Sequence, residues 1–247
     1  MQMEFLPQGP ALVIENTQRV LVIADLHFGI ESEFERKGVH IPSQSRKRFD
    51  RALACIAEAR ADLLVLLGDV KHNVPLTSRQ EFWEMPAILE AFRSKIPFKI
   101  TPGNHDGGLE RFLQEGELLP MRGAVIDGVW YAHGHTYPDP ACAGGLLVVG
   151  HHHPMVSLYD EVGCALHDRA YLIGDVDGDC LHLEPGRGQT RIMFVPSFNE
   201  LSGFDLLELK KSSLGPLTKC TNLNDAEVYL TDGTFVGTMA AIENSRP

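Results

Sequence analysis

Short apolar runs separated by amphipathic stretches organise the first half of the chain. The period of each stretch predicts buried strands over Arg19–Ala24, Leu63–Leu67 and Phe98–Thr101, and helices over Ser43–Arg60 and Ser78–Arg93. We expect Pro86 to kink or divide the second of these helices, and Gly108–Glu115 to form a short one. Strands that alternate with helices in this way predict parallel β-α-β units.

The second half of the chain has a different pattern. Strand-like runs follow one another at Val125–Ala132, Leu146–Val149, Met155–Leu158, Ala170–Ile173, Ile192–Val195, Glu227–Leu230 and Thr234–Met239. Turn dipeptides such as Asp127-Gly128 and Asp232-Gly233 lie among them, so we expect mostly antiparallel pairing. Together the two halves predict an α/β sandwich in which sheet packs against sheet and helices lie outside.

Length and composition limit the class of protein. A chain of 247 residues with 44% hydrophobic content is expected to form one globular domain over 1-247. It has no apolar run near the roughly 20 residues that span a bilayer, and no signal sequence is visible, so we expect a cytoplasmic protein without membrane contact. The odd number of cysteines, five, with no Cys-x-x-Cys pair, predicts free thiols in a reducing compartment.

Charge is distributed unevenly along the chain. The formal net charge is −11, and residues 123–247 hold only 7 basic side chains against 16 acidic ones. Non-specific binding to nucleic acid depends on lysine and arginine contacts with phosphate. A polyanionic substrate must therefore meet a local basic patch or a bound metal.

The positions of the histidines carry the most information about chemistry. Eight of the 11 fall in five short segments, each after a strand-like run: Asp25-Leu26-His27, Gly68-Asp69-Val70-Lys71-His72, Gly103-Asn104-His105-Asp106, His133-Gly134-His135 and Gly150-His151-His152-His153. Loops at the carboxyl ends of parallel strands are where α/β folds place ligand sites. Oxygen and nitrogen donors without thiolates favour Mn²⁺, Fe²⁺ or Zn²⁺.

The spacing inside these segments suggests shared geometry. In extended chain, residues i and i+2 point to the same face, so Asp25 and His27 are expected to hold one ion together. The same logic pairs His151 with His153 and turns His152 away. We expect His135 to lie beside the ligands without being one of them.

In order and spacing, these segments resemble the signature D-x-H, G-D, G-N-H-[DE], H and G-H-x-H of the calcineurin-like metallophosphoesterases. The resemblance implies a four-layered α/β/β/α sandwich with a mixed sheet core and two divalent metals, Mn²⁺ first, with Fe²⁺, Zn²⁺ or Mg²⁺ open. By the same resemblance, Asp25, His27 and His153 hold one metal, Asn104, His133 and His151 hold the other, and Asp69 bridges both.

The resemblance also implies a mechanism. Two ions about 3.5–4 Å apart clamp the phosphoryl oxygens and activate a hydroxide nucleophile. His105 acts as general acid for the leaving oxygen, with Asp106 orienting its ring.

Gly68-Asp69-x-x-His72 looks like the DNA-repair nucleases of the SbcD type and their small stand-alone relatives, some encoded beside helicases or ligases. By this likeness His72 contacts the scissile phosphate, and a helicase or ligase is a possible functional partner. The motif-bearing core spans about 11-160 and a strand-rich extension about 161-247. The extension is too short for both the capping region and the ATPase-binding tail of SbcD-type nucleases, so we do not expect an ATPase partner.

Six basic residues lie between Arg36 and Arg51, directly after the first motif. Arg46, Lys47 and Arg48 are candidate contacts to a phosphate backbone, with a solvated helix face as the alternative. Phe82 and Trp83 are interpreted as helix core, with a stacking platform as the alternative.

We therefore expect a Mn²⁺-dependent phosphodiesterase that hydrolyses nucleic acid, with DNA as the first candidate substrate. Two alternatives stay open: a phosphodiesterase for cyclic nucleotides or dinucleotides, which the acidic balance favours, and an inactive metal-binding scaffold, against which the intact Asp69 and His105 argue. The oligomeric state is left undetermined.

Overall fold

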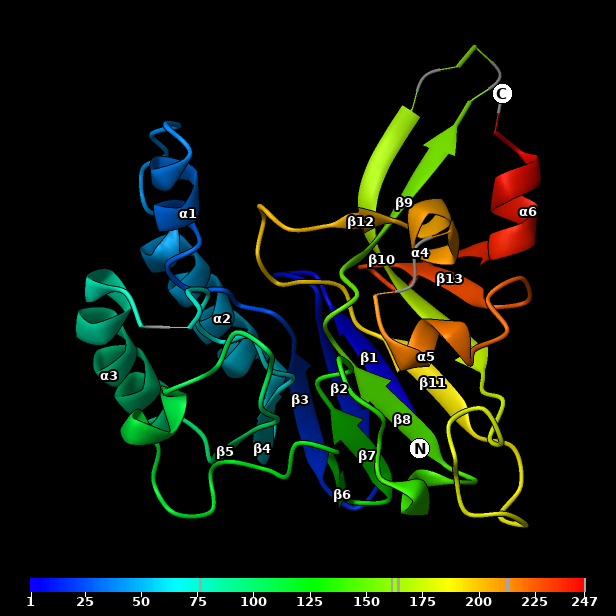
Figure 1. Ribbon diagram of the computed structural model, residues 1–247, viewed down its shortest axis with the longest axis horizontal. Coiled ribbons are helices and arrows are strands. Elements are labelled where there is room, and N and C mark those ends of the chain that lie inside the picture. Colours follow the sequence, from blue (N-terminus) through cyan, green and yellow to red (C-terminus); the bar gives the residue numbers. More distant parts are fainter. Residues whose placement is uncertain (76, 161, 164, 212–213, 247) are drawn as a thin grey trace.

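Two β-sheets lie face to face between two layers of helices in the computed structural model of the chain (Figure 1). The structure describes residues 1–247 apart from 76, 161, 164, 212–213 and 247. This arrangement is the four-layered α/β/β/α sandwich that the sequence predicted, and it confirms the fold class.

The first sheet has the strand order β1-β2-β3-β4-β5. Its strands are β1 (Gln2–Leu6), β2 (Ala11–Glu15), β3 (Arg19–Ile23), β4 (Leu63–Leu66) and β5 (Phe98–Ile100). The helices between them are α1 (Glu31–Arg36), α2 (Ser45–Ala59) and α3 (Arg79–Arg93). Strands β3, β4 and β5 are parallel, as their alternation with helices predicted, whereas β1 and β2 add an antiparallel edge that the sequence analysis missed.

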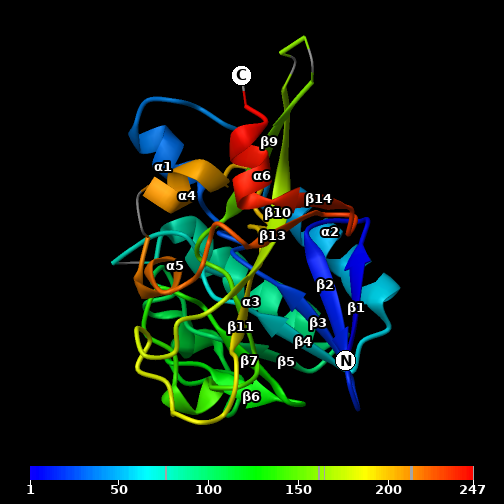
Figure 2. The ribbon, with the colours of Figure 1, turned by 90° about the vertical axis from the view of Figure 1, so that its right-hand side faces the viewer.

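The second sheet has nine strands, in the order β12-β9-β10-β11-β8-β7-β6, with β13 and β14 paired beside β10. Its strands are β6 (Ala124–Ile126), β7 (Val129–Ala132), β8 (Leu146–Val149), β9 (Pro154–Tyr159), β10 (Ala165–Asp175), β11 (Arg191–Phe194), β12 (Phe204–Asp205), β13 (Glu227–Leu230) and β14 (Phe235–Thr238). Short helices are η1 (Leu109–Phe112), η2 (Pro140–Cys142), α4 (Leu206–Lys211), α5 (Pro216–Lys219) and α6 (Met239–Asn244). Strands β9 and β10 extend beyond the rest of the sheet (Figure 2).

The alternation of side chains along each strand builds the layers. In β3, Val20 and Val22 pack between the sheets, while Leu21 and Ile23 face the core under α2 and α3. A third core lies on the outer face of the second sheet, under α4 to α6. Because successive strand residues point to opposite faces, a strand buried on both sides must be apolar at every position. The continuous apolar runs of the sequence are the consequence.

Helix α3 continues through Pro86, so the proline does not divide it. Ser78 caps its first turn, and the Glu81 carboxylate accepts a hydrogen bond from the Ser78 N–H to complete a capping box. Met85, Leu89 and neighbouring apolar side chains pack into the core. Tertiary packing and the cap therefore outweigh the hydrogen bond that proline removes.

One further prediction about strands was wrong. The run Val125–Ala132 is not one strand but the hairpin β6–β7, because Asp127 and Gly128 both adopt positive φ, as a tight primed turn requires. The described strands of the second half are mostly antiparallel, as expected, but β7, β8 and β11 are mutually parallel and β12 is parallel to β9. Connections that cross between layers make this possible, and turn dipeptides do not reveal them.

The cysteines also depart from expectation. Cys180 and Cys220 form a disulfide across 40 residues, with a Cα–Cα distance of 5.5 Å. The prediction of free thiols is wrong for this pair, because folding of the loop after β10 against α5 brings together two cysteines that sequence spacing does not connect. Cys55 and Cys142 are free and buried, and Cys164 lies outside the described residues. Among the residues that the structure describes, no helix is long and apolar enough to cross a membrane.

Candidate metal centre

Loops from both sheets meet at one edge of the sandwich. Each loop follows the carboxyl end of a parallel strand, β3, β4, β5, β7 or β8, and together they carry Asp25, His27, Asp69, His72, Asn104, His105, His133, His135, His151, His152 and His153. The His151 N–H donates to the Asp25 carboxylate at 2.9 Å, which joins the second sheet to the first. The five histidine-bearing segments of the sequence therefore converge at a single place.

Three groups of side chains in this place offer ligand atoms within 4.8 Å of one another. They are Asp25, His27 and His153; Asp69, His133 and His151; and His27, His72 and His105. The first two groups coincide with the two ligand sets that the family resemblance implied. Asn104 adds an amide oxygen 3.1 Å from His133 Nε2.

Asp69 lies between the groups. Its Oδ2 is 3.6 Å from His27 Nε2 in one group and 3.5 Å from His133 Nε2 in another. The side chain is 2% exposed, and its Oδ1 accepts a hydrogen bond from the His105 N–H at 2.8 Å. One carboxylate oxygen is thus anchored to the backbone while the other faces histidines from two loops, as a bridging ligand requires.

The hydrogen bonds of two histidines assign their ring nitrogens. His133 Nδ1 lies 2.7 Å from the Leu67 carbonyl, and His105 Nδ1 contacts the His72 carbonyl. Because a carbonyl only accepts, Nδ1 carries a proton in both rings, and Nε2 is the nitrogen that faces the site; His133 Nε2 is free of its own proton only when the ring is neutral. His133 Nε2 can then bind a cation, and His105 Nε2 can take up and deliver a proton.

The backbone holds this arrangement in a strained conformation. Asp25, His27, Asp69, His151 and His153 all have positive φ, between 45° and 67°, although none is glycine. Such conformations cost about 1–3 kcal/mol each and persist where the surroundings enforce them, often at functional sites. The loops also approach closely: a Cβ added to Gly103 would lie 2.1 Å from Asp69 Oδ1.

The positive φ values show that the prediction of extended backbone at these residues was wrong. Asp25 and His27 do converge, but through left-handed turns and not as alternate residues of an extended strand. His151 and His153 fall in different groups, so they do not pair on one ion as their spacing suggested. His152 is buried apart from the ligand groups, where its Nδ1 donates to the Gly150 carbonyl and its ring packs on Phe194.

The electrostatics of the site favour a cation. Burial by itself lowers the pKa of His133, but the carboxylates of Asp69 and Asp25 outweigh it and raise this pKa to about 9. The pKa of Asp69 is lowered despite burial, because His133 lies beside it. Two buried carboxylates therefore draw positive charge to this point.

The donor set also fits metal ligands. Among the described residues, His27 Nε2 and His153 Nε2 are buried without a hydrogen-bond partner, although His153 Nε2 lies 3.3 Å from Asp25 Oδ1. Unpartnered buried nitrogens are costly unless a ligand satisfies them. Burial lowers the pKa of His27 well below its usual value, which keeps its imidazole neutral and able to coordinate.

His72 and His105 lie side by side at the rim of the site, with ring centroids 4.9 Å apart. His72 Nδ1 is 3.1 Å from His27 Nδ1, and its Nε2 is 2.5 Å from a carboxylate oxygen of Glu33. Hydrogen bonds from Lys37 and then His72 lower the pKa of Glu33 to about 2. The sequence analysis missed Glu33, because nothing in its spacing separates it from the other acids of α1.

Asp106 does not contact the His105 ring in the way that the sequence analysis expected. Its carboxylate accepts hydrogen bonds from the backbone N–H groups of Val70, Lys71 and Gly103. The buried Lys71 ammonium donates to the His105 carbonyl at 2.6 Å. Asp106 therefore fixes the loops that carry Asp69 and His105, and the carbonyl that orients the His105 ring belongs to His72.

The basic segment divides into exposed and buried members. Arg46 and Lys47 are exposed on α2, with Arg46 paired to Asp50. Arg48 has no exposed side-chain surface, because its guanidinium lies between Glu31 and Glu200, so the expected phosphate contact is wrong for it. Phe82 and Trp83 are also not helix core, because they are 49% and 69% exposed.

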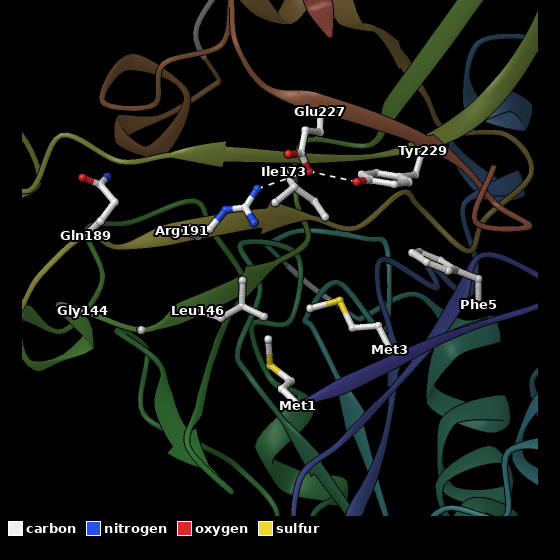
Figure 3. A pocket seen from close by; sticks show the side chains of 11 residues that line it. Met1, Met3, Phe5, Gly144, Leu146, Ile173, Gln189, Arg191, Glu227 and Tyr229 are labelled. Atoms are coloured by element: carbon white, nitrogen blue, oxygen red, sulfur yellow. Dashed lines mark hydrogen bonds and ion pairs between the residues drawn. The ribbon is translucent and has the colours of Figure 1, made fainter. Parts of the chain in front are cut away.

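A cavity of about 520 Å³ lies elsewhere (Figure 3). It is lined mainly by β1 and by the starts of β8 and β11, and Arg191 pairs there with Glu227 at 3.3 Å. His151 follows the opposite end of β8, so this cavity includes none of the predicted ligands.

The chain resembles known proteins in both sequence and fold. The family model described as calcineurin-like phosphoesterase matches residues 18–177. The chain is similar in fold to nuclease MPE of Pseudomonas putida, with a TM-score of 0.54, 16% identity, and coverage of 90% of this chain and 97% of that one. Yfce, a phosphoesterase from E. coli, matches with a TM-score of 0.39, 15% identity, and coverage of 90% and 98%. No curated protein matched.

Proposed function

The chain belongs to the calcineurin-like phosphoesterase family and is a metal-dependent phosphoesterase, and from this premise we propose that it is a Mn²⁺-dependent phosphodiesterase acting on nucleic acid. The observation that carries the proposal is the position of Asp69 between two groups of His and Asp ligand atoms, beside the free Nε2 of His105. The similarity in fold to a nuclease is consistent with it.

Seven residues would act as metal ligands. Asp25, His27 and His153 would hold one divalent ion, Asn104, His133 and His151 a second, and Asp69 both. When bound, such a pair of ions supplies an activated water and neutralises charge on the phosphoryl group. Oxygen and imidazole donors without thiolates suit Mn²⁺.

His105 would protonate the leaving group. With Nδ1 held by the His72 carbonyl, its Nε2 can deliver a proton to the departing oxygen. His72 lies stacked beside it, where a protonated ring can contact a non-bridging oxygen of the phosphate. Burial lowers the pKa of His72, and the Glu33 carboxylate, 2.5 Å from Nε2, opposes this shift.

Substrate choice is the finer part of the proposal. The exposed Arg46 and Lys47 are candidate contacts to a polynucleotide, and a helicase or ligase is a candidate functional partner. The net charge of −11 favours the alternative, a phosphodiesterase for cyclic nucleotides or dinucleotides, since it repels long polyanions.

A panel of metals and substrates tests the proposal. Single- and double-stranded DNA, RNA, a cyclic nucleotide, an aryl phosphodiester and a phosphomonoester are each incubated with Mn²⁺, Mg²⁺, Zn²⁺ or chelator. We expect fastest cleavage of DNA with Mn²⁺, and loss of activity in chelator and in Asp69→Asn. Faster turnover of the cyclic nucleotide than of any polynucleotide would favour the alternative, and activity that survives chelator would contradict both.

A further inference from the structure

A second cleft, of about 660 Å³, opens beside the loop that carries His105. One wall is the first turn of α3, with Arg79 and Phe82, and the other is the chain from Gly107 to Arg111. None of the predicted metal ligands lines it. The cleft is therefore separate from the metal centre, although residues that line it follow His105 closely in the sequence.

Short connections tie both walls of the cleft to the catalytic loops. Gly107 follows His105 by two residues. On the opposite wall, Glu81 is buried in α3 next to Phe82, and its Oε1 accepts from the N–H groups of His72 at 2.8 Å and Asn73 at 2.7 Å. A chain seated in the cleft would therefore lie against elements that are rigidly joined to the reacting centre.

Two arginines in the cleft have charges that the described residues do not neutralise. Arg79 and Arg111 are exposed, and neither forms an ion pair within the described part of the chain. Glu110 is the acidic residue of the lining, so the cleft keeps a positive balance. In a chain of net charge −11, unpaired arginines converging beside a phosphoesterase site point to a phosphate-bearing ligand.

An aromatic ring completes the cleft. Phe82 is 49% exposed, and its inner edge is supported by Phe112, with ring centroids 5.9 Å apart. A Cβ built on Gly107 would meet no atom within 4 Å, so the facing backbone leaves open space. An exposed, supported ring near cationic side chains is the arrangement on which single-stranded bases stack.

We propose that this cleft binds the segment of a single-stranded polynucleotide next to the scissile phosphate, with Arg79 and Arg111 on its phosphates and Phe82 stacked on a base. The proposal rests on the nuclease function proposed above and names the surface that selects a polynucleotide over a small diester. It replaces the interpretation of Phe82 as helix core.

The test measures binding of a fluorescent single-stranded DNA of about 12 nucleotides to the full chain by anisotropy, over a series of salt concentrations. Chelator keeps the DNA intact. Arg79→Gln/Arg111→Gln should weaken binding at least ten-fold and reduce the log–log salt slope by about 1.4, since each lost contact with a single strand removes about 0.7. Phe82→Ala should weaken binding by about 5-fold to 150-fold, with less salt dependence.

Matched variants separate the cleft from general charge and stability. Lys95→Gln removes one charge just beyond the opposite end of α3, and we expect unchanged binding. Arg79→Lys/Arg111→Lys should restore the salt slope, and thermal unfolding shows whether each variant is folded. The proposal is overturned if the full chain does not bind the DNA, or if the double Gln variant binds like Lys95→Gln.

The two proposals fail in different ways. If the strand binds through the cleft but the Mn²⁺-loaded chain hydrolyses only small diesters, the nuclease function fails and the cleft stands. If the loaded chain cleaves DNA and the cleft variants cleave it with unchanged KM, the cleft fails and the nuclease function stands.

Discussion

Replacing Arg48 should act on stability and not on substrate binding. Its guanidinium donates to Glu31 at 3.1 Å and to Glu200 at 2.8 Å. In Arg48→Gln, Glu31 would remain 3% exposed with the Gln44 N–H at 3.0 Å, whereas Glu200 is 27% exposed and keeps Arg51 at 3.7 Å. The substitution therefore leaves mainly the Glu31 carboxylate buried without its cationic partner. Leaving one buried charge unpaired lowers the free energy of unfolding by about 3–5 kcal/mol.

Urea unfolding at pH 7, followed by circular dichroism, measures this cost as a fall in the unfolding free energy. In thermal unfolding of the same variant, we expect Tm to fall by about 6–20 °C. Glu31→Gln/Arg48→Met should recover most of the loss, because it leaves no buried charge at position 31. Arg46→Gln is the control on the same helix: its exposed pair with Asp50 should be worth less than about 1 kcal/mol. A cost below about 1 kcal/mol for Arg48→Gln, with an unchanged m-value, would refute the reasoning.

Three further predictions follow from other parts of the structure. His105→Ala should slow hydrolysis of an alkyl phosphodiester far more than that of an activated aryl diester, and equal losses in kcat would show that His105 is not the general acid. Reducing the Cys180–Cys220 disulfide removes a cross-link between residues 40 positions apart and should lower the unfolding free energy by about 4 kcal/mol; an unchanged urea midpoint in reductant contradicts this. Burial opposes ionisation of Asp205, but hydrogen bonds led by Arg246 lower its pKa. Its contribution to stability is therefore complete above the ordinary carboxyl pKa of about 4 and is lost as pH falls through the lower folded value. The difference between the urea midpoints of the natural chain and Asp205→Asn should shrink as pH falls below about 4, and a constant difference refutes the pairing.

Much of the fold could be predicted from local pattern. Val20 to Ile23 are apolar at every position because β3 is covered on both faces. An unbroken apolar run of this kind therefore predicts a buried parallel strand. The histidine-bearing segments were equally visible, since each follows such a run. The strands β1 and β2 were missed because they form an edge that no helix separates from β3.

The sequence by itself determined which residues are candidates for the chemistry: carboxylates and imidazoles placed after strand ends, in numbers that core packing does not explain. Tertiary structure alone decided how they are used. Left-handed backbone, not strand alternation, turns Asp25 and His27 together, and burial between two acids removes Arg48 from the surface. It also joined two distant cysteines and left Phe82 exposed beside the His105 loop. The physical reason is that residue type and spacing act over a few positions, whereas burial, charge pairing and backbone strain depend on segments that meet only in the folded chain.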